Sequence, residues 1–332
     1  MSASRATIYD VATKAGVSIS TVSLALNAPT RVKPQTLERV LAAADELSFV
    51  PKTEAVSRAR RGVGRIGVIA PFTSYSSFGR RLNGVLRAVH GQSSEIVVYD
   101  EQSAAAAVLA SLPLMQRLDG LIVMSLPFSD DVAQRLIDQQ VTTVLVEVER
   151  PGFSSVTIDD AAGGRMVADL LVGLGHERFG FVGEARQQSH RYVLQSEARL
   201  AGFRDGLARH DRQLSEANIR HVGHSFHAGA SAADELLDLP LRPTAIFAHD
   251  DVIASGVLKK ARARGLHVPN DLAVVGFDDS DVAEHLGLTS VRQPLEESGE
   301  LATETLLAQL ANPRRSLQHT TLKLSLVERD TT

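Results

Sequence analysis

The chain has 332 residues, of which 44% are hydrophobic, and its length predicts two or three domains rather than one. It contains no cysteine, which excludes disulfides and thiolate metal sites. Its net charge is only −4, but residues 1–62 carry a net charge of +4 and the remainder −8, the distribution expected of a small nucleic-acid-binding module attached to a larger acidic body.

Residues 7–26 predict two short helices around a tight turn. Thr7 is a suitable N-cap, Asp10 places a carboxylate on the first turn, and Gly16 ends the first helix. Ser18 caps a second helix over about 19–26. This arrangement is the one that places a helix in the major groove of DNA. A helical hairpin with a solvated face is the competing interpretation.

A third helix follows and completes the N-terminal module. Pro34 suits its first turn, and Phe49 and Pro51 end it. Apolar residues recur within it at three- and four-residue spacing, namely Leu37, Val40, Leu41, Ala44 and Leu47. We therefore expect a three-helix domain over residues 1–49, followed by a linker over 50–63.

From residue 64 the chain alternates short apolar runs with longer amphipathic ones. The predicted strands are 66–70, 95–99, 120–124, 143–147, 179–182, 245–248 and 272–277, and the predicted helices include 80–91, 160–174, 197–210 and 252–264. Nearly continuous apolar strands indicate parallel sheets that are buried on both faces. The pattern predicts a doubly wound α/β body that is better divided into two sheets than kept in one.

Polar residues follow several predicted strands. Such sheets bind ligands at the carboxyl ends of their strands. The residues at these ends are Pro71, Phe72, Ser125, Glu147, His249, Asp250, Asp278 and Asp279. Their convergence indicates a small polar ligand that is held by hydrogen bonds.

Three other patterns in the sequence are similar to those of enzymatic or metal sites. Gly62, Gly64 and Gly67 match the dinucleotide-binding spacing, but they precede a strand instead of following one, so they predict a flexible joint. Histidines 221, 224 and 227 lack accompanying ligands, which favours surface histidines over a metal site. The paired aspartates at 159–160, 250–251 and 278–279 each precede a helix, so N-capping explains one member of each pair.

The whole chain resembles the lactose-repressor/galactose-repressor (LacI/GalR) family of bacterial transcription regulators. In the N-terminal module the matching segments are 6–12 (ATIYDVA), 15–18 (AGVS), 21–23 (TVS), 26–27 (LN) and 39–47 (RVLAAADEL). In the body they are 174–178 (LGHER), 199–203 (RLAGF), 274–279 (VVGFDD) and 291–294 (VRQP).

The resemblance implies the fold class and the domain boundaries. The fold is expected to be α/β, with an N-terminal three-helix helix-turn-helix DNA-binding domain and a two-subdomain, doubly wound, periplasmic-binding-protein-like domain over 64–332. The N-subdomain would comprise 64–162 and 294–322, and the C-subdomain 163–292 and 323–332. A small-molecule effector would bind in the cleft between the subdomains and change how the two DNA-binding domains of a dimer contact DNA.

The resemblance also places the DNA-reading residues. Ile19, Ser20 and Leu24 occupy base-reading positions of the second helix. Because isoleucine and leucine can contact the methyl group of thymine, we expect the half-site to be read partly through thymine methyls. Phosphate contacts, which set the register, are assigned to Thr7, Tyr9, Ser18, Thr21, Ser23 and Asn27.

The linker departs from the family pattern. The family usually has a hinge helix with a leucine that wedges into the minor groove, and such wedges kink DNA. The nearest residues here are Arg58 and Arg60. An arginine can instead enter a narrow minor groove, or the linker can be a solvated basic segment that touches phosphates only. Both alternatives stay open at this point.

Ligand contacts are likewise implied by the resemblance. Arg199 and Asp278 are the first candidates, because a guanidinium and a carboxylate together can bracket sugar hydroxyls. Further polar contacts are expected from Ser125, Glu147, His249 and Gln293, and apolar walls from Phe72, Phe78 and Phe226. His249 stands where the family mostly has asparagine, so the effector cannot be inferred from relatives.

The expected partners are pseudo-palindromic double-stranded operator DNA, a small-molecule effector that is a sugar or sugar derivative, and a second copy of the chain in a homodimer. No cofactor, metal, catalytic residue or membrane contact is expected. The segment 322–329 leaves no room for tetramerising heptads. Because the N-terminus lacks an apolar signal core, we expect a cytoplasmic protein. A nucleotide-dependent enzyme and a transport-type sugar-binding protein are the alternative functions.

Overall fold

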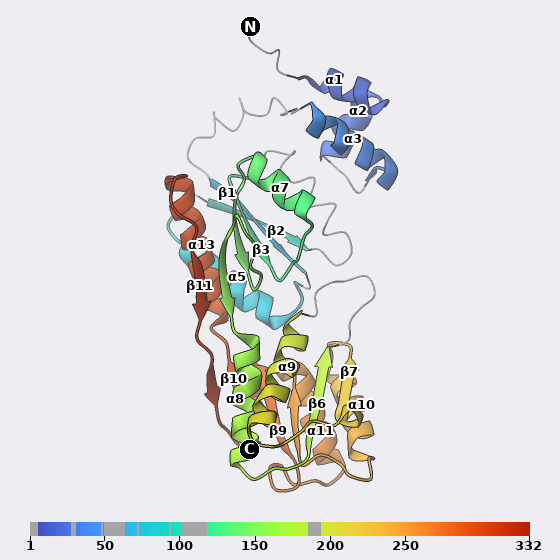
Figure 1. Cartoon of the computed structure of the whole chain (residues 1–332). Coiled ribbons are helices and arrows are strands. Elements are labelled where there is room, and N and C mark those ends of the chain that lie inside the picture. The colour runs from blue at the N-terminus through green and yellow to red at the C-terminus, as the bar shows by residue number, and fades with distance from the viewer. Residues whose placement is uncertain are drawn as a thin grey trace. The chain divides into compact units, whose positions relative to one another are not determined.

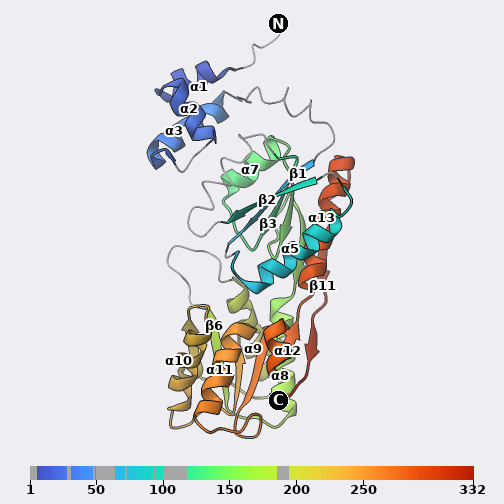
Figure 2. The same ribbon diagram turned by 180° about the vertical axis from the view of Figure 1, so that it is seen from behind.

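The structure is a computed structural model that describes residues 6–27, 31–47, 49, 64–71, 73–92, 94–100, 118–184 and 194–332 (Figures 1 and 2). Residues 50–63 lie outside this part of the chain, so the linker predicted there stays a prediction. None of the described helices is long and apolar enough to cross a membrane.

The N-terminal module is a three-helix cluster made of α1 (Ile8–Ala15), α2 (Ile19–Asn27) and α3 (Pro34–Glu46). Its core includes Val11, Val22, Ala25 and Val40, none of which is measurably exposed. This confirms the predicted apolar faces of the three helices. Phe49 also packs into this core beyond the end of α3.

The turns of the module follow the predicted capping chemistry. The Thr7 hydroxyl accepts a hydrogen bond from the amide of Asp10, and the Asp10 carboxylate accepts from the amide of Thr7 at 2.7 Å. Such reciprocal bonds satisfy amides at the start of a helix. At the other end of α1, Gly16 has a φ of 64°, a left-handed conformation that glycine adopts without steric cost.

The described part of the body forms two six-stranded sheets, as expected of a doubly wound α/β protein (Figure 1). The first sheet has the order β11-β5-β4-β3-β1-β2, with β1 (Gly64–Ala70), β2 (Ser94–Asp100), β3 (Gly120–Met124), β4 (Thr142–Val146), β5 (Ser154–Ile158) and β11 (His319–Leu322). The second has the order β12-β10-β9-β8-β6-β7, with β6 (Phe179–Glu184), β7 (Ile219–Val222), β8 (Ala245–Ala248), β9 (Ala273–Asp278), β10 (Thr289–Arg292) and β12 (Ser325–Val327).

The body also contains helices that alternate with the strands. They are α5 (Ser76–Ala88), α7 (Asp130–Asp138), α8 (Asp160–Gly173), α9 (Leu194–Arg209), α10 (Phe226–Leu237), α11 (Asp251–Ala263), α12 (Asp281–Leu286) and α13 (Leu295–Ala311), with a short 3-10 turn, η2, over Glu216–Asn218. Helices α8 and α9 lie side by side in Figure 1, and α10 and α11 do so in Figure 2.

The chain divides into two compact units. Unit 1 comprises Met1–Thr73, Asn83–Ser155 and Gly299–His319, and unit 2 comprises Ser74–Leu82, Val156–Ser298 and Thr320–Thr332. The division falls inside α5 and inside α13, so each of these helices contributes residues to both units.

The second sheet carries a core on each face. Ile246 and Val274 pack with α10 and α11 on one face, whereas Phe247 and Phe277 pack with α8 and α9 on the other. Strands β9, β8 and β6 are parallel neighbours, and β10 continues the parallel set beside β9. Their carboxyl ends therefore meet at one edge of the sheet, where the polar side chains described below are found.

Helices α8 and α9 approach each other at backbone distance because glycine faces the partner helix on both sides. A Cβ atom on Gly164 would lie 2.2 Å from the carbonyl oxygen of Arg199, and one on Gly202 would lie 2.0 Å from that of Ala161. Any larger side chain would therefore push the helices apart. This contact fixes the position of Arg199, which α9 carries toward the edge of the sheet.

Candidate functional site

The second helix of the N-terminal module presents a polar, accessible face. Val22, Ala25 and Leu26 are buried against the other helices, while Ser18, Ile19 and Ser20 are exposed, with Ile19 at 41%. Ser23 and Leu24 are partly exposed. The residues expected to read bases thus lie on the side of α2 that faces away from the core.

Hydroxyl groups at the start of α2 form a local network. The Oγ atom of Ser18 accepts from the amide of Thr21 at 3.1 Å and lies 2.7 Å from Oγ of Ser20 and 2.8 Å from Oγ1 of Thr21. Ser18 therefore caps the helix as expected. The network holds three hydroxyls together at the end of a helix where amide groups favour an anion such as phosphate.

The remaining residues assigned to DNA differ in how they are placed. The ring of Tyr9 is 65% exposed, and Thr7 lies at the start of α1 with its side chain engaged in the cap. Asn27 is the last residue of α2. Arg58 and Arg60 lie outside the described residues, so the choice between groove insertion and phosphate contact is untested.

In unit 2 the carboxyl ends of β6, β8 and β9 carry Glu184, His249, Asp250 and Asp278, and Gln293 follows the end of β10. His249, Asp250 and Gln293 are buried. The structure therefore brings together His249, Asp278 and Gln293, three of the residues that the sequence assigns to the ligand.

Arg199, on α9, is only 3% exposed. Its Nε atom donates to Oδ1 of Asp160 at 2.8 Å, and its Nη1 atom donates to the backbone oxygen of His249 at 2.7 Å. The guanidinium carbon lies 3.6 Å from the centre of the Phe277 ring, which is a cation–π contact. Arg199 is therefore a buried, positioned cation and not an ordinary surface charge of α9.

Asp278 and Gln293 form a second polar chain. The Nε2 atom of Gln293 donates to Oδ1 of Asp278, and its Oε1 atom accepts from Nη2 of Arg81 at 3.2 Å. Arg81 is buried, and Arg80 donates to the backbone oxygens of Asp278 and Asp279. Burial raises the pKa of Asp278 above its ordinary value, an effect that the charge of Arg199 opposes and that of Asp250 reinforces.

Sequence reasoning missed Tyr75, Glu184 and His224. The hydroxyl of Tyr75 donates to Oε1 of Glu184 at 3.1 Å, and its ring is stacked on that of His224 with the centroids 3.7 Å apart. The Nε2 atom of His224 lies 2.9 Å from Oδ2 of Asp250. His224 is therefore not a surface histidine, which corrects the expectation for this residue. Tyr75 and Glu184 lie a few residues after the predicted strands 66–70 and 179–182, respectively, and this position could have identified them.

The other two histidines, His221 and His227, are exposed, as predicted. The charges around His224 also have a clear balance. Burial lowers the pKa of His224, but its hydrogen bond to Asp250 and the charge of that carboxylate outweigh burial and hold the pKa above 6.5.

The paired aspartates are explained by capping in two cases and not in the third. Asp159 accepts from the amide of Ala162, and Asp250 accepts from that of Ile253, so each caps a helix. At 278–279 the prediction is wrong, because the cap position of α12 is Ser280. Asp278 bonds Gln293, and Asp279 forms ion pairs with Arg292 and Arg329, both at 2.6 Å. The nearby arginines and glutamine outcompete the helix amides for these carboxylates.

Asp251, the first residue of α11, is 1% exposed. Its carboxylate accepts from the amide of Ser280 at 2.7 Å and from the hydroxyl of Ser290 at 2.6 Å. Burial and the neighbouring charge of Asp278 raise the pKa of Asp251 to about 7. Asp251, the second member of the pair 250–251, is therefore a buried acid that is held by two serines and does not cap the helix.

In unit 1 the expected ligand residues lie at the ends of β3 and β4. Ser125 donates a short hydrogen bond to Glu147, and both residues have positive φ angles, 54° and 63°. Non-glycine residues in this conformation are uncommon and cluster at functional sites.

The three phenylalanines expected to form apolar walls differ in exposure. Phe78 is buried, Phe226 is 52% exposed, and Phe72 lies outside the described residues.

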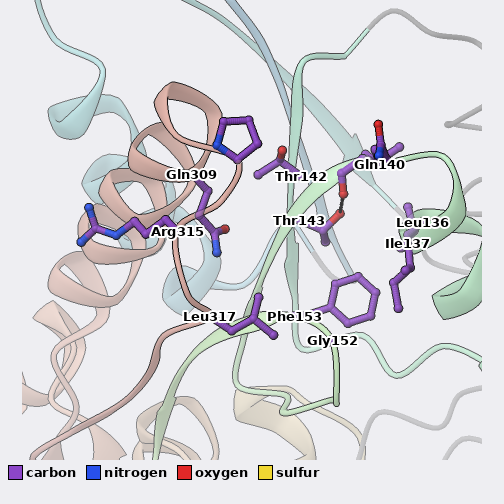
Figure 3. A pocket seen from close by; sticks show the side chains of 12 residues that line it. Leu136, Ile137, Gln140, Thr142, Thr143, Gly152, Phe153, Gln309, Arg315 and Leu317 are labelled. Atoms are coloured by element: carbon purple, nitrogen blue, oxygen red, sulfur yellow. Dashed lines mark hydrogen bonds between the residues drawn. The ribbon is translucent and has the colours of Figure 1, made fainter.

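Unit 1 also contains a surface pocket with a volume of about 390 Å³ at the opposite end of β4 (Figure 3). It is lined by Leu136, Ile137, Gln140, Val141, Thr142, Thr143, Gly152, Phe153, Gln309, Pro313, Arg315 and Leu317. None of the residues expected to bind the ligand lies in it. Figure 3 shows the side chains of Ile137, Phe153 and Leu317 on one side of the view and the guanidinium of Arg315 extending away from them.

Two family descriptions match the chain. Residues 7–52 match the bacterial regulatory proteins of the lacI family, and residues 168–332 match a periplasmic binding protein-like domain. Among characterised relatives, the transcriptional repressor CytR of Escherichia coli is 32% identical over 314 residues, which is 92% of this chain and 90% of that protein. The transcriptional regulator GalS of Salmonella typhimurium is 31% identical over 307 residues, 91% of this chain and 89% of that protein.

Solved structures agree with this assignment. A transcriptional regulator CelR–cellobiose complex matches 99% of this chain and 100% of that chain, with a TM-score of 0.72 and 27% identity. The lac repressor dimer bound to operator and the anti-inducer ONPF matches 99% of both chains, with the same TM-score and identity. The helix-turn-helix module, the two sheets and the end-to-end similarity together show that the chain belongs to the LacI family of bacterial transcriptional regulators.

Proposed function

We propose that this protein is a sugar-responsive transcriptional repressor that binds a two-fold symmetric operator as a homodimer. The observation that carries the proposal is the edge of the second sheet, where buried Arg199 and the side chains of His249, Asp278 and Gln293 converge. Charged and amide groups held in fixed positions at strand ends suit the hydroxyl groups of a sugar. Because operator DNA lies in the bacterial cytoplasm, the proposal places the protein there.

The DNA interface in this proposal is the exposed face of α2. Ile19, Ser20 and Leu24 read base edges, and the hydroxyls of Ser18, Thr21 and Ser23 contact phosphates together with Thr7, Tyr9 and Asn27. Each half-site is read by one copy of the chain, and the symmetry of the dimer sets the symmetry of the operator. Arg58 and Arg60 are retained as minor-groove or phosphate contacts.

The ligand interface in unit 2 consists of Arg199, His249, Asp278 and Gln293, with Tyr75, Glu184 and His224 added to the residues expected from sequence. Ser125 and Glu147 are kept as ligand contacts of unit 1, with Phe72, Phe78 and Phe226 as apolar contacts. The proposal includes no enzymatic reaction, in keeping with relatives that are named as regulators and repressors.

Two linked measurements test the proposal. Selection of bound sequences from a random duplex library by the full chain identifies the operator. A melting-temperature screen with mono- and disaccharides then identifies the ligand, because a compound that binds only the native state must raise the midpoint. Finally, operator affinity is measured with and without the ligand that stabilises the protein most.

We expect an inverted repeat, a stabilising sugar and an operator affinity that falls when this sugar is added. Selection without any enriched motif would overturn the DNA-binding assignment. An operator affinity that no stabilising sugar changes would overturn the regulatory assignment. The variant Arg204→Lys, on the exposed side of α9, is the matched control for Arg199→Lys, which should weaken sugar binding.

A further inference from the structure

The surface pocket of unit 1 lies away from the residues assigned to the effector. It is formed by the end of α7, the start of β4, the segment that precedes β5, and the end of α13 with the residues that follow it (Figure 3). Ser125 and Glu147, by contrast, follow the carboxyl ends of β3 and β4. The pocket volume of about 390 Å³ lies in the range of sites for small organic ligands. A compound bound in this pocket would therefore not take the place of the effector.

The pocket combines a buried floor with an exposed apolar rim. Leu136 and Phe153 are buried, whereas the side chains of Ile137 and Leu317 are 44% and 47% exposed. All four residues line the same pocket. Covering exposed aliphatic side chains with an apolar ligand is favourable, because it removes hydrocarbon surface from water. The lining therefore suits a ligand with an apolar body.

Gln309 carries an unpaired acceptor in this lining. The residue is 7% exposed, and its Nε2 atom donates to Oγ of Ser154 at 2.8 Å. In the described part of the chain, no group donates a hydrogen bond to its Oε1 atom. Figure 3 shows this oxygen on the side of the amide that faces Thr143, another lining residue. Because a nearly buried amide oxygen without a donor is costly, it indicates a donor that a bound molecule supplies.

The other polar groups of the pocket narrow the chemistry of the ligand. The buried hydroxyl of Thr143 already donates to the backbone oxygen of Val141 at 2.9 Å. Among the described lining residues there is no carboxylate, and the one charged side chain is that of Arg315. A sugar would leave many of its hydroxyl groups unpaired against the apolar residues, and an ammonium group would meet no opposite charge. The ligand is therefore largely apolar, neutral or anionic, and carries a hydrogen-bond donor.

We propose that unit 1 contains a second ligand site, which binds a flat aromatic compound that carries a phenolic O–H or a ring N–H. The donor bonds to Oε1 of Gln309, and the ring lies against Ile137, Phe153 and Leu317. An aromatic ring suits this pocket because it joins a large apolar surface to one donor in a fixed direction and has little conformational entropy to lose. The site is independent of the sugar site in the proposed function.

Matched compounds that differ only in the donor test this site. The pairs are 2-naphthol with 2-methoxynaphthalene and indole with 1-methylindole. The chain has no tryptophan, so the fluorescence of these compounds reports their binding to the full chain without interference from indole groups of the protein. We expect 2-naphthol or indole to bind about fivefold more tightly than its methylated counterpart, as for one hydrogen bond. Decahydro-2-naphthol keeps the hydroxyl but not the aromatic ring, and it should displace 2-naphthol poorly.

The variant Gln309→Met identifies the acceptor. It nearly preserves the length of the side chain and removes the amide oxygen, while Oγ of Ser154 still accepts from the amide of Gln318 at 3.0 Å. We expect the dissociation constant of 2-naphthol to rise about fivefold and that of 2-methoxynaphthalene to change less than about twofold. Gln134→Met, at an exposed position of α7, is the matched control and should change neither constant.

Methyl resonances of the unsubstituted full chain locate the bound ring, whether or not the variant folds. A bound aromatic ring shifts the resonances of methyl groups that lie beside it. On addition of 2-naphthol we expect the methyl signals of Ile137 and Leu317 to shift. The methyl signals of Ile246, in the core of the second sheet, should stay in place.

Other outcomes overturn the inference. Equal binding of each compound and its methylated counterpart, or no binding by any of them, would show a pocket that holds only solvent. A preference for the donor that a folded Gln309→Met variant retains, or methyl shifts that exclude Ile137 and Leu317, would place binding elsewhere. Displacement by decahydro-2-naphthol at the concentration at which 2-naphthol itself binds would overturn the aromatic class. None of these results bears on the sugar-responsive function, which is tested separately.

Discussion

The Nε2 atom of His224 lies 2.9 Å from Oδ2 of Asp250, while Oδ1 of the same carboxylate accepts from the amide of Ile253 at 2.7 Å. One side chain thus caps α11 and holds an imidazole at the edge of the sheet. Because the ring of His224 is stacked on Tyr75, the carboxylate also orients an aromatic surface. Asp250 therefore combines the capping role that the sequence predicts with a second contact, to a histidine, that the sequence does not predict.

Asp250→Asn should lower the pKa of His224, because asparagine still caps a helix but carries no charge. Histidine resonances of labelled full-length protein, followed against pH, measure this pKa, and His224→Gln identifies the signal. In the wild type the pKa lies above 6.5, so the pair contributes stability that is fully present below pH 6.5 and lost as pH rises through the raised value. An unchanged His224 titration in Asp250→Asn would contradict the assignment.

Asp251→Asn should change how stability depends on pH. The pKa of Asp251 is about 7 in the folded protein against 3.8 when unperturbed, so its contribution is present below pH 3.8 and lost as pH rises toward 7. At 1.36 kcal/mol per pKa unit, this pKa difference corresponds to up to about 4 kcal/mol in the free energy of unfolding. Urea unfolding should show that the stability of the variant relative to the wild type is greater at pH 8 than at pH 5. Parallel curves at both pH values would contradict the prediction.

Gly202→Ala should destabilise the protein by about 1–3 kcal/mol or more, because the added methyl meets the carbonyl of Ala161 at 2.0 Å. Gly173→Ala is the matched control on α8, since no atom lies within 4 Å of its added Cβ. That variant should gain up to about 1 kcal/mol from helix propensity. Denaturant midpoints compare the two. Equal effects of both substitutions would show that the close approach of α8 and α9 does not matter.

Ile19→Ala should abolish discrimination between thymine and uracil in the half-site, if the isoleucine contacts a thymine methyl. The wild type should lose roughly 1 kcal/mol, about fivefold in affinity, when the contacted thymine is replaced by deoxyuracil. Binding of the four protein and DNA combinations, measured at one salt concentration, gives the coupling. Wild-type affinity that is indifferent to the methyl group would reject this mode of reading.

Much of the fold followed from the sequence, because strong local signals agree with the tertiary structure. The strands over 120–124 and 245–248 begin and end where their apolar runs do, and α1 begins and ends at its capping residues. Strands β5, β10 and β11 were missed. They are short or partly polar, and β11 lies beside β5, a segment distant in the chain, which a local pattern does not reveal.

His249 and Asp278 were predicted from their positions at strand ends, whereas Gln293 and Arg199 were expected from the resemblance. The structure places Arg199 against His249 and Gln293 against Asp278. His224 was judged from its spacing to other histidines, whereas its role depends on Asp250, which lies 26 residues away. Tyr75 and Glu184 were overlooked although both follow predicted strands, because their mutual hydrogen bond joins residues 109 positions apart in the sequence.

The glycine contact between α8 and α9 has a consequence for how such a protein diversifies. The helices are held backbone to backbone, and the apolar cores lie on the two faces of the sheet, so the side chains at its edge contribute little to packing. Substitutions at this edge therefore leave the glycine contact that positions Arg199 and the two apolar cores in place. New chemical specificities become accessible within one inherited scaffold.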